Sequence, residues 1–361
     1  MAVTLRGREL PLPILQGGMG VGVSLGSLAG AVARCGGMGT VSAALCGFDE
    51  PDFETDPFGA NLRALEKEIR CAKALSDGSG LVAVNVMVAT TQYADCVRTA
   101  VRAGAHAVVC GAGLAKDLPA IAKDAGDTAA LAPIVSSGRA AGVLCRLWDS
   151  RYHTVPDFFV LEGPLAGGHL GFSPDEAAAA QAGRPVSLDA LLTEVLSAIA
   201  PYREKYGRDI PVFTAGGVKG GAELAHYQKL GAAGAQFATR FIATEECDAA
   251  DGLKQALVRA KASDIVIVKS PVGMPGRALL SPLMRRVAEG TQPPVGRCIN
   301  CLTPCDRKTA PYCISAALIA AVRGDWENGL FFCGANAGEI KEITTVQEQI
   351  DKILAEWRAA Q

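Results

Sequence analysis

The chain of 361 residues lacks several features that would point to a particular partner or location. Its 35 basic and 37 acidic residues give a formal net charge of −2, so it has no excess of basic charge to attract nucleic acid or an anionic membrane surface. No apolar run is long enough to span a bilayer, and the N-terminal residues lack the apolar core of a signal peptide. We therefore expect a cytoplasmic protein with no nucleic-acid or membrane partner.

Histidine and aromatic residues are scarce as well, with four histidines and 6% aromatic residues. Hydrophobic residues, by contrast, make up 49% of the chain, charged residues 20%, and the 41 glycines follow no repeat. This composition is typical of a globular protein with a large core and many tight turns. The length allows one large domain or two ordinary ones.

Short apolar runs alternate with Ala- and Leu-rich helical stretches such as residues 191–202 and 222–230. The alternation favours βα units and a parallel sheet, and eight such units in about 240 residues suit a (β/α)8 TIM barrel. The expected strands are residues 12–16, 37–42, 82–87, 107–110, 131–135, 158–161, 212–214 and 234–237. A doubly wound sheet is the alternative, but the turn after the first strand lacks both the GxGxxG spacing and the acidic residue that follows it.

Two segments lie outside this alternation. Residues 50–80 carry several charges, and we expect them to form a helical insertion. The barrel pattern ends after about Thr244, and residues 345–358 have the composition of a final helix. We therefore expect a barrel with its insertion over residues 1–261, and a Cys-rich C-terminal extension over residues 262–361 that packs on it.

A glycine-rich loop follows the sixth expected strand and contains Gly167, Gly168 and His169. A histidine at the end of a strand, among glycines that let a flat ligand approach the backbone, is suited to proton transfer or substrate orientation. The alternative is a loop histidine whose nitrogens are satisfied by the backbone. Glu162, directly after the strand, is either a second polar group of the site or a solvated charge at its rim.

Other strand ends carry glycines or small polar residues, and in a barrel these ends meet at the ligand-binding face. They are Gln16, Gly17, Gly18 and Met19 at the first strand, Asn85 at the third, Ala215, Gly216 and Gly217 at the seventh, and Gln236, Ala238 and Thr239 at the eighth. One Gly-Gly turn alone is as well explained by a tight connection. Together, the seventh and eighth ends favour a phosphate site built from backbone amides.

Five of these motifs, in this order, resemble those of the FMN enzymes of the nitronate monooxygenase superfamily. This superfamily was formerly called 2-nitropropane dioxygenase and includes the flavin-dependent enoyl-ACP reductase II. The motifs are residues 16–19, 85, 166–169, 215–217 and 238–241, and the resemblance covers about residues 10–245. The set is specific, although each motif alone is weak.

The resemblance implies a non-covalent FMN at the barrel mouth. The backbone around residues 16–19 would flank the flavin ring and Asn85 its polar edge, while Gly216, Gly217, Ala238 and Thr239 would hold the phosphate. The remaining implied contacts are Glu162, Gly167, Gly168, Ala215 and Gln236. His169 is the expected catalytic residue, because it would face the reactive side of the flavin. The electron-transfer chemistry itself belongs to the cofactor.

The superfamily reaction, oxidation of an alkyl nitronate or a related small substrate, is the first expected activity. The alternative is an enoyl-thioester reductase that uses NAD(P)H, so the expected partner is a small-molecule or acyl-thioester substrate. A flavin- or Fe–S-binding sensor without turnover and, on fold alone, a phosphosugar isomerase are further alternatives. A homodimer is the expected assembly.

The twelve cysteines are unevenly placed, with seven dispersed before residue 248 and five between Cys298 and Cys333. Thiols at this density, in a chain without a signal peptide, do not indicate a disulfide framework. Cys298, Cys301, Cys305 and Cys313 have the spacing C-x2-C-x3-C-x7-C, which favours a [4Fe–4S] cluster over structural zinc, with Cys333 as an alternative fourth ligand. Free thiols or a redox disulfide remain the other alternative.

Overall fold

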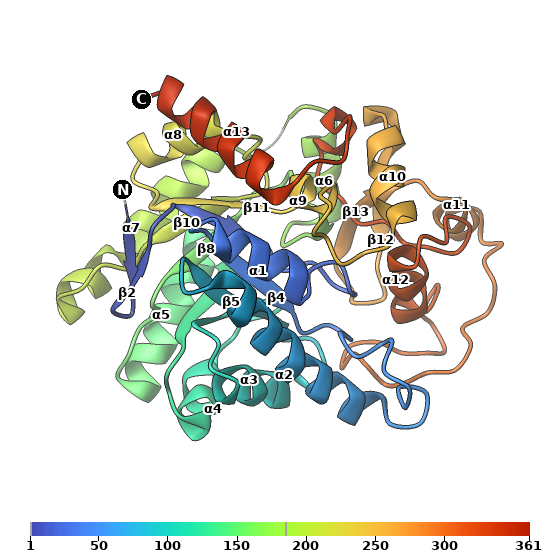
Figure 1. Ribbon diagram of the computed structural model, residues 1–361, viewed down its shortest axis with the longest axis horizontal. Helices are drawn as coiled ribbons and strands as arrows, with labels where there is room; N and C mark the ends of the chain where they lie inside the picture. The colour runs from blue at the N-terminus through green and yellow to red at the C-terminus, as the bar shows by residue number, and fades with distance from the viewer. Residues whose placement is uncertain (1, 185) are drawn as a thin grey trace.

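The computed structural model describes residues 2–184 and 186–361. Eight parallel strands form a closed barrel, in the spatial order β10-β11-β3-β4-β5-β6-β7-β8 (Figure 1). In chain order the barrel strands are β3 (Ile14–Gln16), β4 (Met38–Ser42), β5 (Leu81–Met87), β6 (Ala107–Gly111), β7 (Ala130–Val135), β8 (Phe159–Glu162), β10 (Val212–Ala215) and β11 (Gly234–Phe237). All eight expected strands are confirmed with small shifts at their ends, and so is the (β/α)8 fold.

Helices follow the strands and surround the barrel. They are α1 (Gly26–Arg34), α2 (Pro57–Ser76), α3 (Tyr93–Arg102), α4 (Leu118–Ala125), α5 (Gly138–Tyr152), α6 (Pro174–Gln181), α7 (Leu188–Tyr206) and α8 (Gly221–Lys229). The expected helix within residues 50–80 is α2, which begins after Asp56, whose carboxylate accepts a hydrogen bond from the Gly59 amide (2.9 Å). Since α2 connects β4 to β5, it is a regular barrel helix, and the additional chain is the loop over residues 43–56.

The last helix, α13 (Val346–Ala359), returns to the barrel and confirms the helix expected over residues 345–358. Only a short helix, α9 (Thr239–Ile242), follows β11, and α13 packs beside both α8 and α1 (Figure 1). Arg240 links α13 to the barrel, because its guanidinium donates to Gln349 Oε1 on α13 (2.9 Å) and to the Lys219 carbonyl in the loop after β10 (2.8 Å). Helix α13 therefore fills the place of the eighth outer helix. The division at residue 261 stays a prediction.

The chain between α9 and α13 builds a smaller unit over the barrel mouth (Figure 1). Its elements are α10 (Asp251–Arg259), the 3-10 turns η1 (Ala262–Asp264) and η2 (Ala337–Glu339), strands β12 (Ile265–Lys269) and β13 (Pro275–Leu279), and helices α11 (Pro282–Glu289) and α12 (Ile314–Val322). Strand β13 pairs with β12 and also with β9 (Gly168–His169), where Gly276 lies opposite His169. The C-terminal region is thus bonded directly to the glycine-rich loop.

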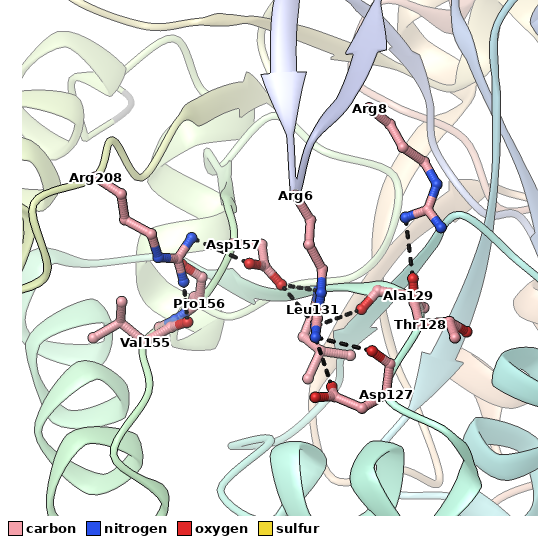
Figure 2. Close-up of polar contacts among 10 residues, drawn as sticks. All are labelled: Arg6, Arg8, Asp127, Thr128, Ala129, Leu131, Val155, Pro156, Asp157 and Arg208. Carbon is pink, nitrogen blue, oxygen red and sulfur yellow. Dashed lines mark hydrogen bonds and ion pairs between the residues drawn. The ribbon is translucent and has the colours of Figure 1, made fainter.

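A hairpin of β1 (Val3–Leu5) and β2 (Arg8–Leu10) closes the other end of the barrel. Leu5 and Leu10 are fully buried in one core cluster with Met38, Leu81 and Ala107, which begin or nearly begin their strands. At the hairpin tip, Arg6 donates to the carbonyls of residues 127 and 129 (both 2.9 Å), as Figure 2 shows. Among the described residues, no helix combines the length and the apolar character needed to cross a bilayer.

Candidate active site at the barrel mouth

Glycines at the end of β10 form one side of the mouth. Gly216 and Gly217 have φ values of +66° and +138°, which residues other than glycine rarely adopt. A Cβ atom on Gly216 would lie 2.5 Å from the carbonyl oxygen of Gly163, so the loops after β8 and β10 touch through their backbones. The expected phosphate side of the mouth is therefore a surface of exposed backbone rather than side chains.

Thr239, at the start of α9, meets the C-terminal segment beside these glycines. Its Oγ1 accepts a hydrogen bond from the Gly334 amide (2.8 Å), while the Ala335 amide donates to the Leu165 carbonyl (3.1 Å). Gly167 packs so closely on the backbone of Cys333 and Gly334 that no Cβ atom would fit there. Four segments, the ends of β8, β10 and β11 and residues 333–335, thus converge.

The first strand end is organised by Gln16, which is fully buried. Its Oε1 accepts from the Thr40 amide (2.8 Å), and its Nε2 donates to the Thr40 carbonyl (3.3 Å) and to the Gly17 carbonyl. The side-chain amide therefore ties β3 to β4 and orients the glycines after it. The Met19 amide is held in turn by Ser24 Oγ (2.8 Å).

Gly17 and Gly18 lie between polar side chains from β11 and β5, the strands on either side of the β3–β4 pair. A Cβ on Gly17 would approach Gln236 Nε2 to 3.0 Å, and one on Gly18 would overlap the side chain of Asn85. Asn85 is oriented by β6, because its Nδ2 donates to the Val109 carbonyl (3.3 Å). The structure therefore brings Gln16, Gly17, Gly18, Asn85 and Gln236 together, as expected for one binding face.

His169 is held on two sides by C-terminal residues. Its Nε2 lies 2.8 Å from Ser270 Oγ, and its ring meets the Phe332 ring edge-on, with centroids 5.1 Å apart. Ser270 Oγ also accepts from the Val272 amide (3.3 Å). Burial lowers the pKa of His169 to about 4, so the imidazole is neutral at pH 7. The partner of Nε2 is thus a side chain from the C-terminal region and not the backbone group that the alternative expects.

Glu162 ends β8 beside Ala215 of β10, at the same mouth. Burial raises the pKa of Glu162 to about 8, and the Arg277 guanidinium opposes this shift only in part. Among the ion pairs of the described residues, none involves Glu162. Of the two alternatives for this residue, the geometry favours a group of the site over a solvated rim charge.

Arg277 is a residue of the site that the sequence did not single out. It is fully buried on β13, and its Nη1 donates to the carbonyls of Pro164 (2.9 Å) and Ala166. Its Nε donates to Gln181 Oε1 (2.9 Å), while its Nη2 has no hydrogen-bond partner among the described residues. The guanidinium thereby fixes the loop that carries His169. The sequence feature that could have identified it is an arginine within the strand Pro275–Leu279, whose other residues are small or apolar.

An apolar pocket of about 590 Å³, its part open to solvent included, lies beside His169. The loop after β4 and the end of β5 form its inner wall, with Ala43, Leu45 and Met87 among the residues that face it. Its outer wall comes from the C-terminal region. The outer residues are Cys301, Leu302, Ile314, Ser315 and Leu318. The sequence analysis did not predict that the C-terminal region lines the site either, because no local sequence pattern indicates which barrel strand a distant segment covers.

The expected metal ligands do not converge. Among the described residues, no group of three or more His, Cys, Asp or Glu side chains could hold a metal ion. Cys298 is exposed, and the Cys301 thiol is engaged by Ser315 Oγ (2.9 Å). The twelve cysteines are free thiols in the part of the chain that the structure describes, and no group of them has the geometry to hold a metal ion, so the structure gives the expected cluster and the zinc alternative no support.

Comparison with known proteins agrees with this geometry. The family described as nitronate monooxygenase matches residues 8–356. A relative from Mycobacterium tuberculosis, (3aS,4S,5R,7aS)-5-hydroxy-7a-methyl-1-oxo-octahydro-1H-indene-4-carboxyl-CoA dehydrogenase, is 28% identical over 280 residues, which are 78% of this chain and 66% of the relative. The matched part of that relative is therefore just under two thirds of its length.

Solved structures give the same result. FabK from Thermotoga maritima superposes with a TM-score of 0.72 and 26% identity, covering 97% of this chain and 94% of that one. A nitroalkane oxidase from Streptomyces ansochromogenes superposes with a TM-score of 0.71 at 22% identity, over 97% of both chains, which supports the fold alone. The match over nearly the whole sequence confirms the expected family: the chain belongs to the nitronate monooxygenase family.

Proposed function

We propose that the chain binds FMN at the barrel mouth and uses it to oxidise an alkyl nitronate or a related small, apolar substrate. The observation that carries the proposal is the convergence of glycine backbone, a neutral, half-buried His169 and an apolar pocket at one end of the barrel. Backbone without side chains suits the phosphate and flat ring of FMN, and the pocket suits the hydrocarbon part of a substrate.

The residues divide into those that hold FMN and those that act on the substrate. Gly216, Gly217, Ala238 and Thr239 would hold the phosphate, with Ala215, Gly167 and Gly168 shaping the cradle. Gln16, Gly17, Gly18, Met19, Asn85 and Gln236 would line the ring, and Glu162 would lie at its edge. When bound, FMN supplies the electron transfer.

His169 would orient the substrate and handle its proton. A neutral imidazole hydrogen-bonded through Nε2 to Ser270 keeps Nδ1 for the substrate, as an acceptor or a donor according to the tautomer. Because the pKa of His169 is about 4, it would act as a base or as a neutral hydrogen-bond donor at pH 7, and not as an imidazolium. Phe332 and Ser270 would fix the ring plane, so that less ordering is needed when substrate arrives.

A second candidate is an enoyl-thioester reductase that takes electrons from NAD(P)H. The names of two relatives favour it, because one is a carboxyl-CoA dehydrogenase and FabK is an enoyl-ACP reductase II. A thioester would place its acyl group in the same apolar pocket, with the carrier outside.

Cytoplasmic localisation and a homodimer belong to the proposal as well. An iron–sulfur or zinc centre does not, because no group of cysteines in the described part of the chain could hold the metal.

Anaerobic reduction of the FMN-loaded protein separates the candidates. Bleaching of the flavin absorbance by a nitronate, followed by recovery with O2, would support the first. Bleaching by NADH or NADPH, with recovery on addition of crotonyl-CoA, would support the second. Bound flavin that no donor reduces would indicate a sensor, and a protein that takes up no FMN would overturn the proposal.

A further inference from the structure

The outer wall of the apolar pocket is a structural part of the barrel mouth rather than a loose cover. Leu302 forms an isolated antiparallel bridge with Thr90, at the loop after β5. The bridge consists of two backbone hydrogen bonds, from the Thr91 amide to the Cys301 carbonyl (3.1 Å) and from the Thr303 amide to the Ala89 carbonyl (2.9 Å). These two backbone hydrogen bonds fix the position of Leu302 relative to β5.

The rest of that wall comes from α12, which presents Ile314 and Leu318 to the pocket. Leu302 and Ile314 are at most 7% exposed and share a core cluster with Leu330 and Met284, so the wall is backed by packed side chains. Leu318 is half-buried at the edge of the same cluster. Since packed walls deform little, the size of the cavity is defined by these three side chains.

The polar side chains around the pocket are already satisfied by the protein. Asn61 Nδ2 donates to the Ala43 carbonyl (3.2 Å) and to Gln92 Oε1 (3.3 Å), and Gln92 Nε2 donates to the Phe58 carbonyl (3.0 Å). Thr90 Oγ1 donates to the Met87 carbonyl (2.8 Å). No Asp, Glu, Lys or Arg of the described chain lines the pocket. A charged or strongly polar group placed here would lose its hydration and find no partner.

We propose that Leu302, Ile314 and Leu318 determine the substrate specificity of this site, and that the group they receive is a compact uncharged hydrocarbon, either branched alkyl or alicyclic. The inference rests on the proposed function, because it places the reacting end of the substrate at His169. It goes further by assigning the selection of the substrate to the C-terminal region, whereas the barrel supplies the cofactor site and His169.

The test uses the full-length FMN-loaded protein and a series of nitronates prepared from nitroethane, 1-nitrobutane, nitrocyclohexane and 6-nitrohexanoate. We expect kcat/KM to rise about fourfold for each methylene that enters the pocket, as the transfer of apolar area predicts. Nitrocyclohexane should give the highest value. The nitronate of 6-nitrohexanoate should be at least ~100-fold poorer than that of 1-nitrobutane, because the carboxylate at the end of its hydrocarbon chain would be buried without a partner.

Variants at the half-buried position 318 keep the test separate from folding. Leu318→Phe should lower kcat/KM for the cyclohexyl nitronate about tenfold and leave that for nitroethane nearly unchanged, whereas Leu318→Ala should favour the bulkier substrate. Leu230→Ala, at an exposed leucine (40%) outside the pocket, is the matched control and should change neither. Equal changes for all substrates at position 318, or good turnover of the charged substrate, would overturn the inference.

A calorimetric titration with neutral nitrocyclohexane in the absence of O2, so that turnover cannot continue, separates this inference from the proposed function. Binding that Leu318→Phe weakens and Leu230→Ala does not would support the pocket assignment even if no nitronate is oxidised. In that case only the proposed function fails. Absence of binding to the folded, FMN-loaded protein would overturn the pocket assignment itself.

Discussion

The two ends of the barrel use charge in opposite ways. At the end closed by the β1–β2 hairpin, Asp157 accepts from the Leu131 amide (2.8 Å) and from Arg208 (3.1 Å), and Arg6 lies 3.6 Å away (Figure 2). At the mouth, Glu162 has no ion-pair partner among the described residues, and burial moves its pKa far from its ordinary value.

The difference shows which end is built for closure and which for binding. Buried charges that are paired and hydrogen-bonded hold a structure in place. A half-buried carboxyl and a half-buried imidazole that form no ion pair cost stability, and such groups concentrate at functional sites. The comparison therefore predicts that changes at the closed end alter stability without altering ligand binding, and that changes at the mouth alter ligand binding or catalysis.

The largest effect should follow from removal of His169. His169→Gln should lower kcat about 10²–10⁴-fold, the usual contribution of a group that transfers or directs a proton, without changing the dissociation constant of FMN. His226→Gln is the matched control, since His226 is an exposed histidine bonded to Asp189 (3.0 Å). Steady-state kinetics and a fluorescence titration with FMN would check both. Unchanged kcat in the His169 variant would exclude it as the catalytic residue.

The glycine cradle should be nearly as sensitive. Gly216→Val puts a β-branched residue at φ +66° and a Cβ atom 2.5 Å from the Gly163 carbonyl oxygen, so the loop has to shift. We expect FMN affinity to fall at least ~100-fold, because strain of this kind costs on the order of 1–3 kcal/mol before any lost contact is counted. The titration with FMN measures it. Gly207→Val, also at positive φ but with open space around it, controls for backbone strain alone.

The closed end should respond in stability only. Asp157→Ala leaves Arg208 and the Leu131 amide without their partner, and we expect a loss of about 3 kcal/mol in the free energy of unfolding with unchanged FMN affinity. Arg8→Ala, which removes a surface bond to the Thr128 carbonyl (3.0 Å), should cost under about 1 kcal/mol. Urea unfolding gives both values. A loss of FMN binding in folded Asp157→Ala would break the distinction between the two ends.

Glu162 should make the stability of the flavin-free protein depend on pH. Its pKa is raised from 4.5 to about 8, so the folded state binds this proton more tightly than the unfolded state does. The resulting contribution to the free energy of unfolding is fully present below pH 4.5 and is lost as pH rises through 8. We expect a loss on the order of 1–2 kcal/mol between pH 6 and pH 9, which Glu162→Gln should reduce. His169 titrates in a separate window, between its unfolded pKa of 6.5 and about 4, where falling pH destabilises the protein. If the natural protein and Glu162→Gln have identical urea midpoints at every pH from 6 to 9, Glu162 is not the group that titrates.

The smallest effect concerns the positioning of His169. Ser270→Ala removes the hydroxyl at 2.8 Å from Nε2 but leaves Phe332 against the ring, so we expect a decrease in kcat of roughly threefold to tenfold, the worth of about one hydrogen bond. Burial keeps the pKa of His169 low in either protein. The pH profile of kcat/KM should shift only if the hydroxyl also selects the tautomer, and Ser270→Thr should restore the activity of the alanine variant.

Local patterns predicted much of the barrel and of its cofactor side. The eight strands are short apolar runs bounded by glycines, and His169, Asn85 and the Gly216–Gly217 turn lie at their ends, where barrel geometry brings ligand-binding residues together. The charges of the α2 segment indicated an insertion, although α2 is an ordinary connecting helix. The cysteine spacing suggested a metal site, but spacing constrains only the backbone, and among the described residues no group of these thiols has the geometry to hold a metal ion.

By itself, the sequence determined the period of the βα units and the glycines that the mouth requires, because both are set by backbone sterics and by burial within a few residues. Tertiary structure alone decided that β13 would pair with β9, that Ser270 and Phe332 would hold His169, and that Leu302, Ile314 and Leu318 would wall the pocket. These contacts join residues that are far apart in the chain. They depend on how the C-terminal region packs over the barrel, and the local preferences of residues for helix, strand or turn do not predict that packing.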